Sequence, residues 1–262
     1  MTRLDLAMAE RGLAPSRTKA QELIKLGLVK CDNKLVLKPN YEVNDETKLT
    51  ILTNDRLKYV SRAGLKLEKA IEAFNLSLKN LCVMDIGSST GGFTDCALQN
   101  GASHVIAVDV GTNLMHPSLR TNPKIDLHEQ TNFKTFASNY FKNIDLIVCD
   151  VSFISLKQIM QKIFAENIKT DMVCLIKPQF ECGKVLAAKY KGVVLNKKVH
   201  IQIINDLVQF FNQLNFYLQG ITISPIKGGD GNIEYLVLIS NKVNSNVNFN
   251  VEKLVSSAFK SH

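Results

Sequence analysis

VMDIGSSTGGF, from Val83 to Phe93, is the stretch that decides the fold. It begins as an apolar strand, turns tightly at Gly87 and enters a helix whose first turn holds Thr94 and Asp95. A strand, a glycine turn and a helix in this order are typical of the crevice at the carboxyl edge of a parallel sheet, where nucleotide-type ligands bind. The stretch therefore predicts a Rossmann-like α/β domain with a ligand site over the turn.

The turn departs from the dinucleotide fingerprint. That fingerprint requires glycine where Ser89 stands, because a pyrophosphate must approach the backbone closely there. A ligand without phosphate fits better, and the D-x-G-x-x-x-G-G pattern resembles the turn of S-adenosylmethionine-dependent enzymes. The alternative is a plain glycine loop that eases helix packing. On the cofactor interpretation, the contacting residues are Asp85, Gly87, Ser89, Gly91, Gly92 and Phe93.

The rest of the domain repeats the strand and helix pattern. Asp109 closes the next strand, where its carboxylate can accept hydrogen bonds from both hydroxyls of a ribose. Apolar strands alternate with amphipathic helices at the spacing of βαβ units, so we expect a seven-stranded, mostly parallel sheet. The expected strands are Cys82–Ile86, His104–Asp109, Ile125–His128, Asp145–Cys149, Met172–Ile176, Gly220–Ile226 and Glu234–Ile239. Long helices are expected near Arg62–Phe74, Ser155–Asn167 and Lys197–Leu214.

The composition indicates a folded protein with an acidic partner. The chain has 262 residues, of which 45% are hydrophobic and 21% charged. Its formal net charge of +8 favours binding to phosphates, or to an anionic membrane surface. No secretory signal follows Met1, and no apolar run reaches the roughly 20 residues of a membrane span. We therefore expect a cytoplasmic protein.

The amino-terminal segment has a different pattern. Two short helices, the second capped by Ser16, precede expected strands at Val29–Cys31, Lys34–Leu37 and Lys48–Leu52. The run R-L-D, G-L-A-P-S-R, L-I and G-L-V resembles the small S4-like RNA-binding module of a ribosomal protein. We assign residues 1–53 to an S4-like RNA-binding domain, 54–60 to a linker and 61–262 to the Rossmann-like methyltransferase domain.

This resemblance implies a role for basic residues of the module. Arg3, Arg17 and Lys19 would contact phosphates of folded RNA, which orients a substrate without reading its bases. The alternative is that these charges form only a solvated helix face. The match over nearly the whole module favours the RNA-binding interpretation.

Five sequence motifs occur in order along the chain. They are Y-V-S-R-A-G-L-K-L, D-I-G-S-S-T-G-G-F-T, C-D-V-S-F-I-S-L, L-I-K-P-Q-F-E and G-N-I-E-Y. Together they resemble the TlyA family of ribosomal RNA 2′-O-methyltransferases, which have an FtsJ-like catalytic domain and are also labelled haemolysins. The resemblance implies S-adenosylmethionine as cofactor and Arg62 as a further RNA-binding residue. It also implies a catalytic tetrad of Lys66, Asp150, Lys177 and Glu234.

The reaction requires a ribose 2′-hydroxyl aligned with the methyl group, with loss of its proton during attack. We favour Lys177 as the group nearest the hydroxyl, with Asp150 and Glu234 orienting both ammonium groups. Lys66 would stabilise developing charge on the oxygen. A neighbouring cation lowers a lysine pKa and a carboxylate raises it, so the sequence leaves the net shift open. Each of the four residues alone also has an ordinary structural explanation as a cap or strand end.

Two phenylalanines admit more than one interpretation. Phe153 and Phe180 can stack on the adenine of the cofactor or on RNA, but packing in the core is the commoner fate of such residues. We include Phe153 among the expected cofactor-binding residues. The histidines lack the short paired spacing of zinc ligands, so we expect no metal.

The resemblance implies ribosomal RNA within a ribosomal subunit as the partner, with no membrane required and no DNA expected. Cytidine riboses are the implied target. The chain begins almost at its RNA-binding module, which favours large-subunit (23S) rRNA, with small-subunit (16S) rRNA as a further substrate to test. Three other functions compete: a haemolysin or membrane-active protein, an RNA-binding accessory protein without catalytic activity, and a small-molecule methyltransferase, which would leave the basic amino-terminal module unexplained.

Overall fold

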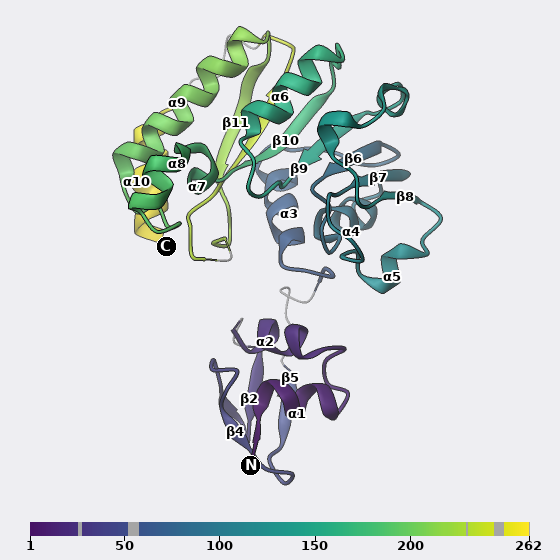
Figure 1. Cartoon of the computed structure of the whole chain (residues 1–262), viewed down its shortest axis with the longest axis vertical. Helices are drawn as coiled ribbons and strands as arrows, with labels where there is room; N and C mark the ends of the chain where they lie inside the picture. Colours follow the sequence, from purple (N-terminus) through teal and green to yellow (C-terminus); the bar gives the residue numbers. More distant parts are fainter. Residues whose placement is uncertain (26–27, 52–57, 229, 244–248, 262) are drawn as a thin grey trace. The chain divides into compact units, whose positions relative to one another are not determined.

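The computed structural model describes residues 1–25, 28–51, 58–228, 230–243 and 249–261. They form two compact units, Met1–Lys58 and Tyr59–His262 (Figure 1). Most of the expected linker, residues 54–57, lies outside the described residues. Tyr59, which was expected in the linker, is 5% exposed and packs in the core of the second unit.

The first unit is a small α+β fold. Strand β2 (Val29–Cys31) lies between β3 (Lys34–Leu35) and β5 (Leu49–Ile51), and β1 (Thr2–Arg3) pairs with β4 (Glu42–Val43). Helices α1 (Leu4–Glu10) and α2 (Arg17–Lys25) contact each other and supply buried residues to the core of this unit. The hydroxyl of Ser16 accepts the backbone N–H of Lys19 at 3.2 Å, which confirms the expected cap.

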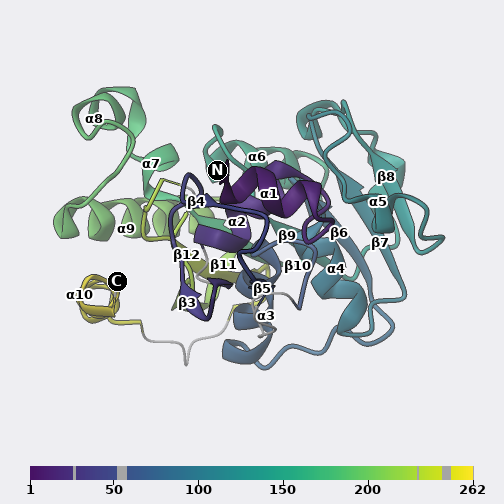
Figure 2. The same ribbon diagram turned by 90° about the horizontal axis from the view of Figure 1, so that it is seen from below.

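The second unit contains the expected seven-stranded sheet, in the order β11-β12-β10-β9-β6-β7-β8. Neighbours from β10 to β8 are parallel, whereas β12 is antiparallel to both β10 and β11. Figure 2 shows β11 and β12 at one edge of the sheet and β7 and β8 at the other. The strands are β6 (Cys82–Ile86), β7 (His104–Val108), β8 (Ile125–His128), β9 (Leu146–Cys149), β10 (Asp171–Ile176), β11 (Tyr217–Ile223) and β12 (Tyr235–Ser240).

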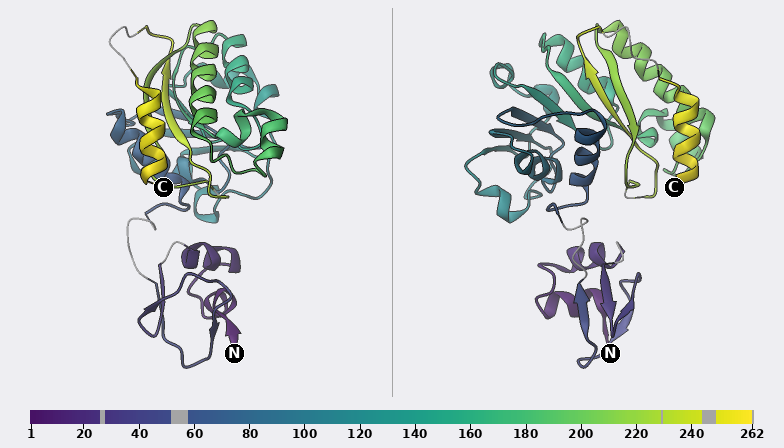
Figure 3. Two further views of the ribbon diagram at one scale, coloured as in Figure 1. Left: turned by 90° about the vertical axis from the view of Figure 1, so that its left-hand side faces the viewer. Right: turned by 180° about the vertical axis from the view of Figure 1, so that it is seen from behind.

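Helices cover both faces of this sheet. One face packs on α3 (Ala63–Ala73) and α4 (Gly92–Gln99), and the other on α6 (Leu156–Ala165), α9 (Lys197–Gln213) and α10 (Val251–Ser261). Alternation along each strand feeds both cores: Val83 joins the first and Met84 the second. Figure 3 shows α9 and α10 side by side. Short elements complete the unit: α5 (Pro117–Arg120), α7 (Pro178–Glu181), α8 (Gly183–Lys189), η2 (Phe133–Thr135) and η3 (Ser138–Phe141).

One expected strand is displaced. The segment expected at Gly220–Ile226 begins earlier and ends at Ile223. Pro225 lacks a backbone N–H and cannot continue the ladder, whereas Tyr217 pairs with Ser240 across the sheet. Within the described residues, no helix combines the length and the apolar character that crossing a bilayer requires.

Candidate active site

The four residues of the expected tetrad come from separate elements and meet at one edge of the sheet. Asp150 directly follows β9 and Lys177 directly follows β10, which is the parallel neighbour of β9. Lys66 lies on α3, which contacts β12, and Glu234 immediately precedes β12. Carboxyl ends of adjacent parallel strands share one edge, so this topology gathers the set.

The four side chains form a continuous chain of ion pairs. Glu234 Oε2 accepts from Lys66 Nζ at 2.8 Å, and the same ammonium lies 3.3 Å from Asp150 Oδ2. Asp150 Oδ1 lies 2.6 Å from Lys177 Nζ, which also donates to the hydroxyl of Ser152 at 2.9 Å. The side chains are between 2% and 12% exposed. Buried charges in this geometry are kept only when they are paired, as they are here.

Two opposing effects set the charge states. Burial lowers the pKa of Lys66, but the carboxylates of Asp150 and Glu234 outweigh it and the net shift is upward. Burial likewise raises the pKa of Asp150, but the ammonium groups of Lys66 and Lys177 outweigh it and the net shift is downward. Lys66 is therefore a permanent cation near neutral pH and Asp150 a permanent anion.

The glycine turn from Gly87 to Gly91 lies at the same edge of the sheet, beside Asp150. Gly87 has φ +83°, and a Cβ there would lie 3.0 Å from the carbonyl oxygen of Asp150. Gly91 has φ +89°, and a Cβ there would lie 2.4 Å from Met115 Sδ. Both positions therefore require glycine for backbone conformation and for space. The turn can approach Asp150 closely only because Gly87 lacks a side chain.

A cavity of about 380 Å³ opens beside the turn. Its size falls in the range of about 300–1,000 Å³ typical of small-molecule sites. Asp109 stands in its wall, where its carboxylate accepts the backbone N–H groups of Ser89 at 2.8 Å and Gly111 at 2.7 Å. Most of the wall is apolar, with Ile86, Val108, Val110, Leu114, Phe133, Val151, Ile154 and Ile159.

A smaller cavity of about 140 Å³ adjoins it. Gly87, Ser89, Asp150 and Ser152 line both cavities, so the two share a wall. Lys177 lines only the smaller one, together with Gly92 and Phe93. Lys66 and Glu234 line neither cavity. Of the two tetrad cations, Lys177 is thus the one that faces open space.

Two expected cofactor residues do not line these cavities. Gly91 instead packs against Met115 and Leu119. Asp85 is fully buried beneath the turn, and one of its oxygens accepts a 2.6 Å hydrogen bond from Thr94. Burial raises the pKa of Asp85 to about 7. Asp85 and Gly91 therefore support the turn by packing and hydrogen bonding and do not line the cavities.

The buried carboxyl of Asp85 gives a pH-dependent stability. Its pKa in the folded protein, about 7, lies above its ordinary value of 3.8, so the proton binds more tightly to the folded state. The stabilisation by this proton is complete below about pH 4 and is lost as the pH rises through 7. We expect the free energy of unfolding of Asp85→Asn, relative to wild type, to rise by up to roughly 4 kcal/mol between pH 4 and pH 8. Urea denaturation at both pH values measures it; a constant difference would contradict the burial effect.

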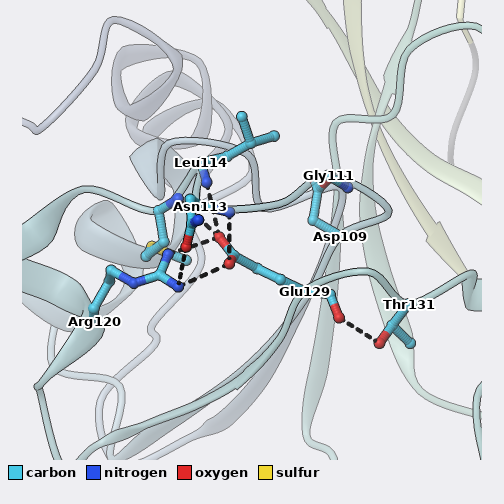
Figure 4. Close-up of polar contacts among 8 residues, drawn as sticks. Asp109, Gly111, Asn113, Leu114, Arg120, Glu129 and Thr131 are labelled. Carbon is cyan, nitrogen blue, oxygen red and sulfur yellow. Dashed lines mark hydrogen bonds and ion pairs between the residues drawn. The ribbon is translucent and has the colours of Figure 1, made fainter.

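One carboxylate that shapes the large cavity, Glu129, lies outside the motifs that the sequence offers. Glu129 accepts the backbone N–H groups of Asn113, Leu114 and Met115 at 2.9, 2.9 and 3.1 Å. It also pairs with Arg120 at 2.8 Å, as Figure 4 shows. These contacts fix the segment that carries Leu114 into the cavity wall. Glu129 follows directly after β8, so the strand-end argument that identified Asp109 could have found it.

The expectation that Phe153 packs in the core is wrong. Its side chain is 91% exposed, at the rim of the large cavity. Its ring centroid lies 5.1 Å from that of Phe180, and its backbone has φ +65°. With this backbone conformation, the side chain lies in solvent and not in the core. The hydroxyl of Ser155 and the backbone N–H of Leu156 donate to the partly buried Glu181, which holds the end of this segment.

The expected RNA-binding residues lie in both units. Arg3 and Arg17 are about half exposed, at 47% and 53%, and both contact Asp5 in the first unit. Lys19 lies on α2, and Arg62 precedes α3 in the second unit. Among the described residues, no three or more His, Cys, Asp or Glu side chains are grouped so as to hold a metal ion.

Comparison with known proteins identifies both units. The FtsJ-like methyltransferase family matches residues 59–241, and the S4 domain matches residues 2–49. The 16S/23S rRNA (cytidine-2′-O)-methyltransferase TlyA of Mycobacterium tuberculosis is 37% identical over 237 residues, 90% of this chain and 88% of that protein. The chain belongs to the TlyA family of FtsJ-like methyltransferases.

Other TlyA relatives extend the match. The 23S rRNA (cytidine-2′-O)-methyltransferase TlyA of Campylobacter jejuni is 39% identical, over 89% of this chain and 97% of that protein. A solved structure that carries the hemolysin name, from Streptococcus thermophilus, is 36% identical with a TM-score of 0.75 over 99% of this chain and 96% of that one. The predicted methyltransferase fold is confirmed, and the methyltransferase interpretation is favoured over a membrane-active protein.

Proposed function

We propose that this chain uses S-adenosylmethionine to methylate the 2′-hydroxyl of cytidine in ribosomal RNA. The observation that carries the proposal is the buried chain of ion pairs from Glu234 through Lys66 and Asp150 to Lys177, which ends in open space beside a nucleoside-sized cavity. Two TlyA relatives carry cytidine-2′-O-methyltransferase in their names. Both names include 23S rRNA, so large-subunit RNA is the first substrate to test.

The large cavity suits S-adenosylmethionine in its chemistry. Asp109 can accept hydrogen bonds from ribose hydroxyls, and the apolar wall can enclose an adenine. Lys134 is the one cationic side chain of this wall among the described residues, and it donates to Gln158, so the site offers little to a phosphate. Gly87 and Ser89 would lie beneath the methionine end, and Phe153 would border the opening. The cofactor supplies an electrophilic methyl carbon when bound.

The tetrad residues have distinct roles in the proposed mechanism. Lys177 lines the small cavity and holds the ribose 2′-hydroxyl, whose proton must leave as the oxygen attacks. Asp150 orients Lys177 through the 2.6 Å contact. Lys66 is enclosed by two carboxylates and stays charged, so it fixes Asp150 in place and adds positive potential near the developing negative oxygen. Glu234 anchors Lys66.

On this proposal, the first unit, Met1–Lys58, binds the RNA; we call it the S4 unit. Arg3, Arg17 and Lys19 would contact phosphates and orient the substrate, while Arg62 would do so next to the catalytic helix. The physiological partner on this proposal is a ribosomal subunit, and the chain acts where ribosomes are found, in the cytoplasm. Neither DNA nor a membrane takes part.

The test uses cofactor labelled in its methyl group. Purified protein is incubated separately with unmodified large and small ribosomal subunits, and the label is mapped by nuclease digestion and mass spectrometry. We expect label on a cytidine ribose of 23S rRNA, and label on 16S rRNA would add the second substrate. Absence of label from both subunits would refute the proposal, and leakage of dye from liposomes would favour the membrane-active alternative.

A further inference from the structure

A buried carboxylate in the S4 unit gathers two arginines that come from different elements. Asp5 is 0% exposed and lies in the first turn of α1. Its Oδ1 accepts from Arg3 Nε and its Oδ2 from Arg3 Nη2, both at 3.0 Å. Oδ2 also accepts from Arg17 Nε at 2.9 Å and from the amide of Gln21 at 2.6 Å. One carboxylate thus joins β1, α1 and α2.

About half of each arginine side chain is exposed to solvent. The Arg3 and Arg17 side chains are 47% and 53% exposed, although the carboxylate between them is inaccessible. An arginine has five N–H donors in a rigid fork. Asp5 accepts from Nε and Nη2 of Arg3 and from Nε of Arg17, so the other donors of both side chains do not contact it. The two positive charges outnumber the one negative charge, so the cluster keeps a net charge of +1. A phosphate can accept hydrogen bonds from the N–H groups of Arg3 and Arg17 that Asp5 does not engage.

Asp5 affects the binding of a phosphate by Arg3 and Arg17 in two opposite ways. Judged by charge alone, a carboxylate beneath two phosphate-binding arginines should weaken RNA binding. Orientation works in the opposite direction, because a long side chain that is already fixed loses less conformational entropy when it binds. A bidentate contact such as that between Asp5 and Arg3 fixes both position and plane.

We propose that Asp5 is a positioning residue for RNA recognition, holding Arg3 and Arg17 as a preformed fork for a backbone phosphate of the ribosomal RNA. This inference rests on the proposed function, because it takes RNA as the ligand of the S4 unit. The competing view is that Asp5 is a structural ion pair that merely ties α1 to its neighbours. The two views predict different RNA affinities for variants that have the same charge.

The experiment compares two variants of the full-length protein that each remove one negative charge from the S4 unit. Asp5→Asn removes the carboxylate beneath the arginines, and Asp45→Asn removes an exposed one elsewhere in the unit. Affinity for an unmodified 23S rRNA transcript is measured by filter binding. We expect Asp45→Asn to bind as tightly as wild type or more tightly, and Asp5→Asn to bind about tenfold more weakly. Equal affinity of the two variants would overturn the inference.

A second pair of variants covers the case in which Asp5→Asn does not fold. Arg3→Lys with Arg17→Lys keeps both charges and a pairing with Asp5 but loses the rigid fork. We expect its KM for RNA to rise several-fold while kcat at saturating RNA is unchanged, and an unchanged KM would count against positioning. Arg3→Met with Arg17→Met tests the RNA contact itself. If that variant binds RNA like wild type, the proposed RNA face fails; if only it weakens binding, the inference about Asp5 fails alone.

Discussion

Replacing Lys177 with methionine is expected to reduce methyl transfer by roughly a hundredfold to ten-thousandfold, the usual range for loss of a proton-transfer or charge-stabilising group. Methionine fills similar space but removes the ammonium that Asp150 and Ser152 hold at 2.6 and 2.9 Å. Because Lys177 lines the small cavity and not the large one, cofactor affinity should stay within about threefold of wild type. Single-turnover transfer to ribosomal subunits and calorimetry with S-adenosylmethionine measure the two effects.

A charge-matched control separates this effect from general electrostatics. Lys142→Met removes one positive charge from an exposed position of the same unit and should leave the rate of transfer unchanged. A Lys177→Met enzyme with the wild-type rate would remove Lys177 from the mechanism. Equal losses of rate and of cofactor affinity would instead assign it to the cofactor site.

The sequence predicted the fold class, whereas the members of the candidate site came from the family resemblance. Once the resemblance names Asp150 and Lys177, sheet geometry explains why they lie together, because parallel neighbours in a sheet end at the same edge. Lys66 and Glu234 came from the same resemblance, without a sheet-edge argument to support them. No local pattern indicates that α3 lies against β12, because that contact depends on long-range packing.

The wrong or missing predictions depend on the path of the backbone and on contacts between distant residues, which local sequence patterns do not specify. Whether an aromatic residue packs in the core depends on the path of its backbone, and the positive φ of Phe153 turns it outward. Asp85 has the sequence signature of a ligand contact, yet its side chain lies on a covered face of β6, where it is fully buried beneath the turn. The position of Glu129 after a strand could be read from the sequence, but its role could not, because its backbone N–H partners lie 14 to 16 residues earlier in the chain and form no motif with it.

Replacing Asp109 with alanine is expected to raise the Kd for S-adenosylmethionine about a hundredfold. The carboxylate accepts the backbone N–H groups of Ser89 and Gly111, which both line the large cavity, at 2.8 and 2.7 Å, and each charge-assisted hydrogen bond contributes about 1.5–3 kcal/mol. On the proposed function it also holds the ribose hydroxyls of the cofactor. Calorimetry measures the affinity directly, without RNA.

The rate at saturating cofactor distinguishes this residue from the tetrad. Asp109 does not contact the chain of ion pairs in the described structure, so kcat for Asp109→Ala should recover to within a few-fold of wild type once the cavity is filled. Asp126→Ala is the matched control, because its carboxylate lies on the neighbouring β8, pairs with His128 and lines neither cavity. Asp126→Ala should bind the cofactor like wild type. If both variants bound the cofactor equally well, the large cavity would not be the cofactor site, and the position of Lys177 beside it would need another explanation.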